Sequence, residues 1–421
     1  MSHAFKSNFS RRNFMRGLGA ASVAAASLPS FAAVKGAGAS LQNHGLVDGD
    51  MSALGGAMTD GVVFISMNEN PLGPAPSALE AIHTTASMGN RYHGDIIQET
   101  VSTAIDLFGM RRGYVGLFPG SAGPLNLAIA SNIGPDRPLV YADPTYEQGP
   151  SVADTLGVPK FAVKLTPTYA HDVRAMVAAT PNAGAYYIVN PNNPTGTLTP
   201  KEDIVWLLKN KPAGSVVIVD EAYHHFCEAE SCLDLVAADQ DIIVTRTFSK
   251  IYGMAGLRAG LCFARPDYFQ KFRQLSQFAP SLASISITSA AGAKAALLDK
   301  ELVPLRRKIN ADNREQTIAF LTKRGYHVLP GSQANFFMVD TKRPGGEFQN
   351  SMLDENVAIG RTWSALPTYV RVTVGTRDEM QKFESAFVKC MDKTPASSNG
   401  ASLHRPVRIP SELHRGDIHW A

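Results

Sequence analysis

Lys250 is the side chain with the clearest chemical potential in this chain. It ends the segment Thr247-Phe248-Ser249-Lys250, and Arg258 follows within Gly256-Leu257-Arg258-Ala259-Gly260. The two hydroxyls and the arginine could bind a phosphate, with the guanidinium gripping it through charge-assisted hydrogen bonds. The amine could form an imine with an aldehyde. A Ser-Lys pair on its own is usually an exposed surface feature without a function. This segment therefore predicts a site only together with other functional residues.

An acidic residue follows a second apolar run. Asp220 comes directly after Val216-Val217-Ile218-Val219 and is followed by Glu221-Ala222-Tyr223. A carboxylate at the end of so apolar a strand costs free energy unless a cation pairs with it. A protonated pyridine nitrogen would be a suitable partner, because the ion pair keeps the ring cationic and electron-withdrawing. Taken alone, a structural salt bridge explains this acid equally well.

Three further segments offer groups that a phosphorylated ring could use. Pro119-Gly120-Ser121-Ala122-Gly123-Pro124 opens a helix, and the backbone N–H groups of a helix start favour a phosphate. Tyr146, after Asp143-Pro144-Thr145, offers a ring for stacking. Asn193 lies in a turn held by two prolines. Taken singly, these features are matched by a plain turn, a packing tyrosine and an Asx turn.

Apolar runs must position these groups. They cover residues 114–118, 138–141, 185–189, 216–219 and 242–245. Each run is rich in β-forming residues and unbroken by charge, which predicts strands covered on both faces and hence a largely parallel sheet. Helical patterns over 124–132 and 201–209 alternate with the runs, as in a three-layer α/β domain. Ligands bind such sheets at the carboxyl ends of the strands, where all five polar segments fall.

The combined set predicts a pyridoxal phosphate (PLP) enzyme. It supplies a phosphate cradle, a ring stacker, an acid for a ring nitrogen, polar groups for a ring hydroxyl, and an amine for an aldehyde. No other common ligand needs all five. The four cysteines, at 227, 232, 262 and 390, match no common zinc spacing, so no metal is expected. They are interpreted as buried thiols, and a Cys227–Cys232 disulfide stays open but is not favoured.

Length and composition place this site in a soluble protein of more than one domain. The chain has 421 residues, 44% of them hydrophobic, and a formal net charge of +3. That charge predicts neither a nucleic-acid nor a membrane partner, and no run is long enough to cross a bilayer. A helix-rich stretch over 269–324, with a long amphipathic segment at 291–323, precedes apolar strands at 336–339 and 369–374 and a helix at 377–391. The predicted organisation is an arm at 33–77 joining a small domain, a large PLP-binding domain at 78–276, a small α+β domain at 277–392 and a disordered tail at 393–421.

The first 32 residues predict an export signal. Twin arginines in Ser10-Arg11-Arg12-Asn13-Phe14-Met15-Arg16 precede a mildly apolar stretch, Gly17 to Leu28, and a small-x-small cleavage pattern, Ser30-Phe31-Ala32. This order resembles a twin-arginine translocation (Tat) signal, a route that carries folded proteins. The expected location is the periplasm, with the cofactor loaded before export and no membrane anchor after the signal is removed.

The motifs together resemble a known family. Asn-Pro-x-Asn-Pro-Thr-Gly at 190–196, Asp-Glu-Ala-Tyr at 220–223, Ser-Lys with Gly-Leu-Arg-x-Gly at 249–260, and Arg371 in Tyr-Val-Arg-Val-Thr-Val-Gly-Thr resemble the fold-type I class I/II aminotransferases. The subgroup most similar is the histidinol-phosphate aminotransferases, and the resemblance runs from about residue 64 to 391. It implies the PLP-transferase fold, a large three-layer domain with a mostly parallel sheet plus a smaller α+β domain.

The resemblance implies a role for each matched residue around the cofactor ring. Lys250 forms the Schiff base and then moves a proton between the substrate Cα and the cofactor C4′. Asp220 pairs with the pyridine nitrogen, and Tyr146 stacks on the ring. Asn193 and Tyr223 hydrogen-bond the 3′-oxygen.

It also implies residues for the phosphate and the substrate. The phosphate ligands are the backbone N–H groups of Ser121 and Ala122, the side chains of Thr247, Ser249 and Arg258, and Tyr92, which reaches the partner's site across a homodimer interface. Arg371 binds the substrate α-carboxylate with help from Asn70. Arg361 falls where histidinol-phosphate enzymes keep an arginine for the substrate phosphate, although a surface arginine explains it equally well.

These assignments predict transamination between an α-amino acid, or a moiety with a free α-carboxylate, and a 2-oxo acid. A PLP-dependent lyase, decarboxylase or cyclase would bind the cofactor with the same residues and stays the alternative, with a secreted peptide or siderophore precursor as a conceivable substrate. A non-catalytic relative would be expected to lose Lys250, Asp220 or Arg371, and all three are present. The substrate stays open, because Ala122-Gly123 replaces a polar family position, the arm lacks a tyrosine segment, and a periplasmic address argues against histidine biosynthesis.

Overall fold

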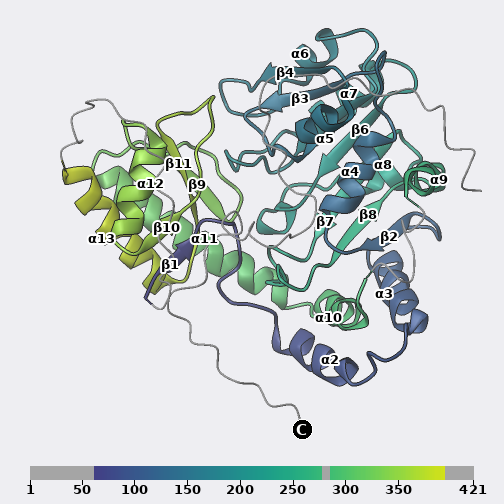
Figure 1. Ribbon diagram of the computed structural model, residues 1–421, viewed down its shortest axis with the longest axis horizontal. Coiled ribbons are helices and arrows are strands. Elements are labelled where there is room, and N and C mark those ends of the chain that lie inside the picture. Colours follow the sequence, from purple (N-terminus) through teal and green to yellow (C-terminus); the bar gives the residue numbers. More distant parts are fainter. Residues whose placement is uncertain (1–60, 277–284, 394–421) are drawn as a thin grey trace, which may run out of the picture. The chain divides into compact units, whose positions relative to one another are not determined.

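Figure 1 shows a computed structural model of the chain, which describes residues 61–276 and 285–393. The predicted export signal, the first part of the predicted arm and nearly all of the predicted tail lie outside the described residues. None of the described helices is long and apolar enough to cross a membrane.

A seven-stranded sheet forms the centre of the larger part. Its order is β2 (Val115–Phe118), β8 (Gly260–Phe263), β7 (Ile242–Thr247), β6 (Val216–Asp220), β5 (Ala185–Val189), β3 (Leu139–Asp143) and β4 (Lys160–Lys164). Within this sheet β8 runs in the opposite direction to the other strands, antiparallel to both β2 and β7. The predicted, largely parallel sheet is therefore confirmed. Strands β4 and β8 were not predicted, because β4 is an edge strand with lysines at both ends and β8 opens on a glycine.

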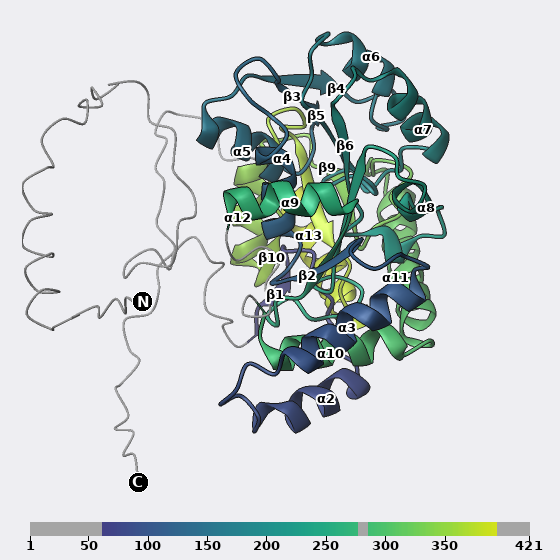
Figure 2. The same ribbon diagram turned by 90° about the vertical axis from the view of Figure 1, so that its right-hand side faces the viewer.

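Helices cover both faces of the sheet, as Figures 1 and 2 show. One face packs against α4 (Ala122–Ala130), α5 (Gln148–Leu156) and α9 (Pro266–Leu275). The other packs against α3 (Gly94–Leu107), α6 (Val173–Ala178), α7 (Lys201–Asn210), α8 (Leu233–Ala237) and α10 (Ile287–Leu298). Burial on both sides explains why the central strands read as unbroken apolar runs.

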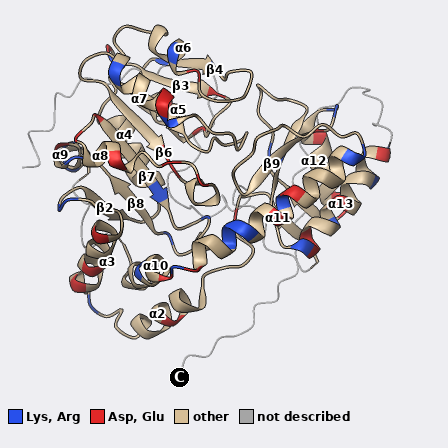
Figure 3. Cartoon of the chain, turned by 180° about the vertical axis from the view of Figure 1, so that it is seen from behind, with Lys and Arg blue, Asp and Glu red and all other residues tan. Residues whose placement is uncertain are grey.

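A smaller module is built from two short sheets. β1 (Val63–Ile65) pairs in parallel with β10 (Val357–Ile359), and β9 (Phe336–Asp340) pairs antiparallel with β11 (Tyr369–Thr373). These strands pack with α12 (Gly345–Asp354) and α13 (Arg377–Asp392) around a core of their own. α13 carries both acidic and basic residues along its length (Figure 3).

The amphipathic stretch at 291–323 forms two helices rather than one. α10 ends at Leu298, and α11 (Leu302–Lys323) begins after a break of three residues, 299–301. Pro304 lies in the first turn of α11, where its missing N–H is tolerated; further inside a helix it would break the backbone bonding. α10 packs against α2 (Pro76–Ala86), and its buried alanines join the core of the large sheet. α11 passes from that core at Leu302 to the core of the smaller module at Leu321.

Candidate active site

Five polar segments meet at the carboxyl edge of the sheet. Asp220 ends β6, Thr247 ends β7, and Ser121, Tyr146 and Asn193 follow β2, β3 and β5. Antiparallel β8 adds its first residue to the same edge, because Phe118 at the end of β2 is opposite Gly260. The topology therefore brings together groups that the sequence separates by more than a hundred positions.

The two acids after β6 lie on opposite faces of the sheet. Val217 and Val219 belong to one core and Val216 and Ile218 to the other, so the side-chain alternation of a strand sends Asp220 and Glu221 apart. Side chains on the neighbouring strand β7 alternate between the two faces in the same register. Thr245 therefore faces Asp220, and Arg246 faces Glu221.

Glu221 receives a cation and Asp220 does not. Arg246 donates from Nε to Glu221 at 2.9 Å and lies within 2.8 Å through Nη2. Burial alone would raise the pKa of Glu221, but Arg246 holds it below its ordinary value. Asp220 accepts only neutral donors, Thr245 Oγ1 at 3.1 Å and the Ala222 N–H at 3.2 Å. Within the described residues no ion pair is formed to it.

The environment of Asp220 fits a cationic ring nitrogen. The residue is 3% exposed, and burial raises its pKa to about 6. A buried carboxylate with no ionic partner is costly, and a ligand that brings a positive charge would remove that cost. The structural salt bridge considered as the alternative for this acid is instead formed by Glu221.

Lys250 lies between the charged groups of the site. Its Nζ donates to the backbone carbonyl of Met67 at 3.0 Å and lies 5.7 Å from the centre of the Tyr223 ring. Burial, and then the nearby positive charge of Arg371, lower the pKa of Lys250 to about 8. The amine is consequently far more nucleophilic near neutral pH than an ordinary lysine.

The predicted phosphate cradle is assembled as a compact group. Thr247 Oγ1 donates to Ser249 Oγ at 2.9 Å, and Arg258 Nη1 donates to the same oxygen at 3.2 Å. Ser121 precedes α4, and its side chain does not cap the helix, so the first N–H groups of α4 stay available to an anion.

Two glycines allow the cradle to close. A Cβ on Gly260 would lie 2.4 Å from the backbone carbon of Gly120 and 2.6 Å from Ser121 N. Gly120 itself has a φ of +80°, and a Cβ there would clash with the Arg258 guanidinium. Only residues without a side chain let β8, the turn after β2 and Arg258 approach one another this closely.

Arg371 is a buried guanidinium that lacks an acidic partner. Nη1 donates to Asn193 Oδ1 at 2.7 Å and Nη2 to Ser66 O at 2.8 Å, whereas Nε is buried without a partner. Burial lowers its pKa to about 10, so the side chain keeps its charge at neutral pH. The bond to Asn193 joins β11 of the smaller module to the turn after β5. A carboxylate would complete the pairing of this guanidinium.

Asn193 and Tyr223 keep donors free for a ligand. Asn193 uses only its Oδ1 toward Arg371, and its amide nitrogen has no partner in the described part of the chain. The Tyr223 hydroxyl accepts from Asn68 Nδ2 at 2.9 Å, so its own proton can go to another acceptor. Tyr146 is partly buried at the same edge, and burial, followed by the charge of Asp220, raises its pKa.

The structure brings Asn68, not Asn70, into the site. Asn68 bonds Tyr223 and exchanges hydrogen bonds with Thr373, while Asn335 donates to its carbonyl at 3.1 Å. The Asn70 amide donates to Ile251 O and does not contact Arg371. Asn68 has a φ of +55°, which is uncommon outside glycine. The motif Asn68-Glu69-Asn70-Pro71 indicated this turn, but the predicted role was assigned to Asn70.

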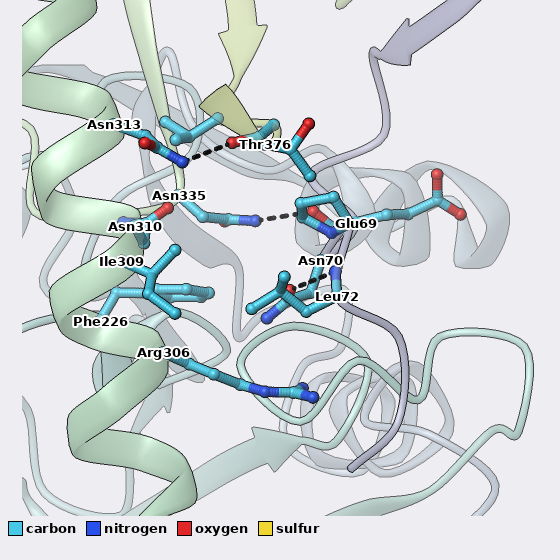
Figure 4. Close-up of a pocket in the computed structure, with 13 residues that line it drawn as sticks. Glu69, Asn70, Leu72, Phe226, Arg306, Ile309, Asn310, Asn313, Asn335 and Thr376 are labelled. Carbon is cyan, nitrogen blue, oxygen red and sulfur yellow. Dashed lines mark hydrogen bonds between the residues drawn. The ribbon is translucent and has the colours of Figure 1, made fainter. Parts of the chain in front are cut away.

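Asn70 instead lines a separate pocket behind the 69–72 turn. Figure 4 shows this pocket between that turn and α11, with Arg306, Asn310 and Asn313 on the helix side. Lys250, Asp220 and Arg371 do not line it. The pocket is therefore distinct from the constellation at the sheet edge.

Two predicted residues stand apart from this group. Tyr92, between α2 and α3, is 79% exposed. Arg361 is half exposed, lies over the Trp363 ring at 4.6 Å and forms an ion pair with Glu147. Trp363 also stacks near Arg371, at 5.2 Å. Trp363 and Glu147 were not predicted as site residues, because neither belongs to a recognisable motif.

Comparison with known proteins shows the family to which the chain belongs. Residues 60–387 match the family described as aminotransferase class I and II. The chain belongs to this family. Histidinol-phosphate aminotransferase 1 of Nitrosococcus oceani is 33% identical over 331 residues, 77% of this chain and 87% of the relative. An aromatic amino acid aminotransferase of Cutibacterium acnes is 31% identical over 327 residues, 76% of this chain and 90% of the relative.

Solved aminotransferase structures share the fold. A protein of Erwinia carotovora atroseptica, described provisionally as a histidinol-phosphate aminotransferase, superposes with a TM-score of 0.74 at 29% identity and covers 78% of this chain and 96% of its own. Histidinol-phosphate aminotransferase of Sinorhizobium meliloti, solved with PLP, has a TM-score of 0.71 at 23% identity and covers 78% and 91%. The predicted fold class is confirmed.

As a class I and II aminotransferase, the chain is a transaminase whose cofactor is PLP. Its own residues fit that group: a buried acid lacking a cation, a cradle closed by glycines, and an amine with a lowered pKa lie at one edge of the sheet. All four cysteines are buried and unpaired, so Cys227 and Cys232 form no disulfide in this structure.

Proposed function

We propose that this aminotransferase transfers the amino group of an α-amino acid with a free α-carboxylate to a 2-oxo acid, with Lys250 as the group that moves the proton. Arg371 is the observation that carries the proposal. It is a charged, buried guanidinium with one nitrogen unpartnered, and it forms no ion pair with an acid among residues 61–276 and 285–393. A substrate carboxylate supplies that missing acid.

Bound PLP supplies an electron sink that accepts the electrons released when the substrate Cα loses its proton. Asp220 would hold the pyridine nitrogen protonated, since its carboxylate has no competing cation. Asn193 and Tyr223 would hold the ring oxygen, and Tyr146 would cover one face of the ring. The cradle of Thr247, Ser249, Arg258 and the α4 N-terminus would bind the phosphate.

Lys250 is suited to proton transfer by its charge state. With a pKa of about 8, its amine can be neutral and accept a proton from the substrate Cα near physiological pH. Arg371 contributes to this lowered pKa while it orients the carboxylate, so the same side chain fixes the substrate and tunes the base.

A spectroscopic half-reaction tests the proposal. The purified, PLP-loaded protein should show a visible absorption band that an amino donor bleaches and that a 2-oxo acid restores. Lys250→Ala should lack this cycle while still binding PLP. Product analysis separates the alternative chemistries, because a lyase or decarboxylase would release a fragment or carbon dioxide. If no amino donor bleaches the band of the wild-type protein, transamination is wrong.

We further propose that the protein is exported in folded form and acts as a homodimer. The twin arginines at 11 and 12 and the cleavage pattern ending at Ala32 support export by the Tat route. Replacing both arginines by lysine should leave the full-length protein in the cytoplasm, where fractionation would find it. The exposure of Tyr92 supports a dimer in which this side chain reaches the partner's cofactor phosphate.

A further inference from the structure

One charge pair spans the two parts of the active site. Glu147 directly follows Tyr146 in the segment between β3 and α5, and Arg361 lies after β10 in the smaller module. The two side chains form an ion pair, each partly exposed. Arg361 also lies over Trp363, whose ring is 5.2 Å from the Arg371 guanidinium. The ion pair is therefore next to Tyr146 in the sequence, through Glu147. It is linked to Arg371 through the Trp363 ring, which lies near both arginines.

Both charges affect the pKa values of buried residues in the site. Arg361 and Glu147 shift the pKa of Arg371 in opposite directions, and they do the same to Tyr146. Their effects on a substrate bound at Arg371 are therefore of opposite sign. A negative group on the substrate's distal end would gain little from Arg361, because it would have to displace Glu147 or lie beside it.

We propose that Glu147 is a specificity-determining residue that neutralises Arg361 and so selects an amino donor with an uncharged side chain over one with a distal carboxylate or phosphate. This inference rests on the proposed transamination. An uncharged side chain can lie near the Arg361 guanidinium without competing for the ion pair with Glu147. An anionic side chain of a substrate would be repelled by the Glu147 carboxylate, which already pairs with Arg361.

Matched ligands measure this preference without turnover. 3-Phenylpropionate and glutarate are carboxylates that resemble phenylalanine and glutamate without the amino group, and calorimetry on the PLP-loaded enzyme gives their dissociation constants. Wild-type protein should bind 3-phenylpropionate more tightly. Glu147→Gln should shift the ratio of the two constants toward glutarate on the order of tenfold, because it leaves Arg361 without its anion. The half-reaction rates with phenylalanine and glutamate should shift in the same direction.

Two further variants make the result specific. Adding Arg361→Gln to Glu147→Gln should abolish the gain for glutarate, since the freed cation is then gone. Glu355→Gln, which breaks the contacts of Glu355 with Lys389 and Lys393 away from the site, should leave the ratio unchanged. An unchanged ratio in Glu147→Gln, with transamination intact in the wild type, overturns this inference alone. If no donor reacts with the wild type, it is the proposed function that fails.

Discussion

Burial of Asp220 makes the stability of the cofactor-free protein depend on pH. Its folded pKa, about 6, lies above the ordinary value for an aspartate, so folding disfavours its charged form. The contribution to stability is complete below the unfolded pKa of about 4 and is lost as the pH rises through the folded pKa. Above pH 6 the loss is on the order of 2–3 kcal/mol.

Asp220→Asn should therefore stabilise the cofactor-free protein at neutral pH. Asparagine can still accept from Thr245 and Ala222 but carries no charge. Denaturant unfolding should give a gain on the order of 2–3 kcal/mol at pH 7 that disappears below about pH 4. The same variant, loaded with PLP, should lose roughly 100-fold or more in half-reaction rate. Equal stability of the two proteins at pH 7 would show that this carboxylate is not strained in the cofactor-free state.

The pKa of Lys250 can be read from the rate of cofactor loading. Only the neutral amine attacks an aldehyde, so the rate at which PLP produces the visible band should rise with a midpoint near pH 8. Arg371→Gln removes a nearby positive charge and should move the midpoint to higher pH. Thr376→Ala, which lies outside the site, is the control. A midpoint that Arg371→Gln leaves in place would contradict the assigned coupling.

At the scale of elements, the sequence predicted those strands and helices that a local pattern of residues encodes. Unbroken apolar runs predicted the central strands β5, β6 and β7, and the polar residues after them predicted the sheet edge that carries the site. Asn68 and Trp363 were missed for a different reason. Asn68 reaches Tyr223, and Trp363 reaches Arg371, only because distant segments pack together, and no local periodicity records that packing.

The glycine contact between β8 and the cradle gives an element-scale prediction. Gly260→Ala places a methyl group against the backbone of Gly120 and Ser121, so β8 or the turn must move away. The affinity for PLP should fall by on the order of tenfold or more, as measured by equilibrium titration of the visible band. Gly346→Ala in α12, where a Cβ meets nothing within 4 Å, should bind PLP like the wild type. Unchanged affinity in Gly260→Ala would mean that the close approach is not required.

The start of α13 carries a prediction about stability alone. Thr376 accepts from the Glu379 N–H, and the Glu379 side chain accepts from the Thr376 N–H at 2.7 Å, forming a capping box. Thr376→Ala should lower the free energy of unfolding by about 1 kcal/mol. Thr376→Ser keeps the acceptor oxygen and should recover most of the loss. Chemical denaturation of all three proteins checks this.

At the scale of the whole molecule, the site depends on two separately packed cores. Arg371 and Asn68 come from the smaller module and its entering strand, whereas their partners Asn193 and Tyr223 come from the large sheet. α11 contributes to both cores and so links them through one helix. If these residues act as proposed, substrate orientation and cofactor binding are coupled through the contacts between these parts, and Glu147 with Arg361 adds a charged contact of the same kind.

The proposed dimer predicts a result that a monomer would not give, namely recovery of activity when two inactive variants are mixed. Tyr92 is 79% exposed, and in a symmetric dimer each copy would complete the partner's site. Tyr92→Ala and Lys250→Ala should each be nearly inactive alone, the first through weak PLP binding. After mixing and re-association, about half of the dimers are hybrids, and each hybrid has one site with an intact Lys250 and a Tyr92 from its partner. Half-reaction activity should therefore reappear on mixing. If Tyr92 served its own chain, or no dimer formed, the mixture would stay as inactive as its components, and the exposed tyrosine would need another explanation.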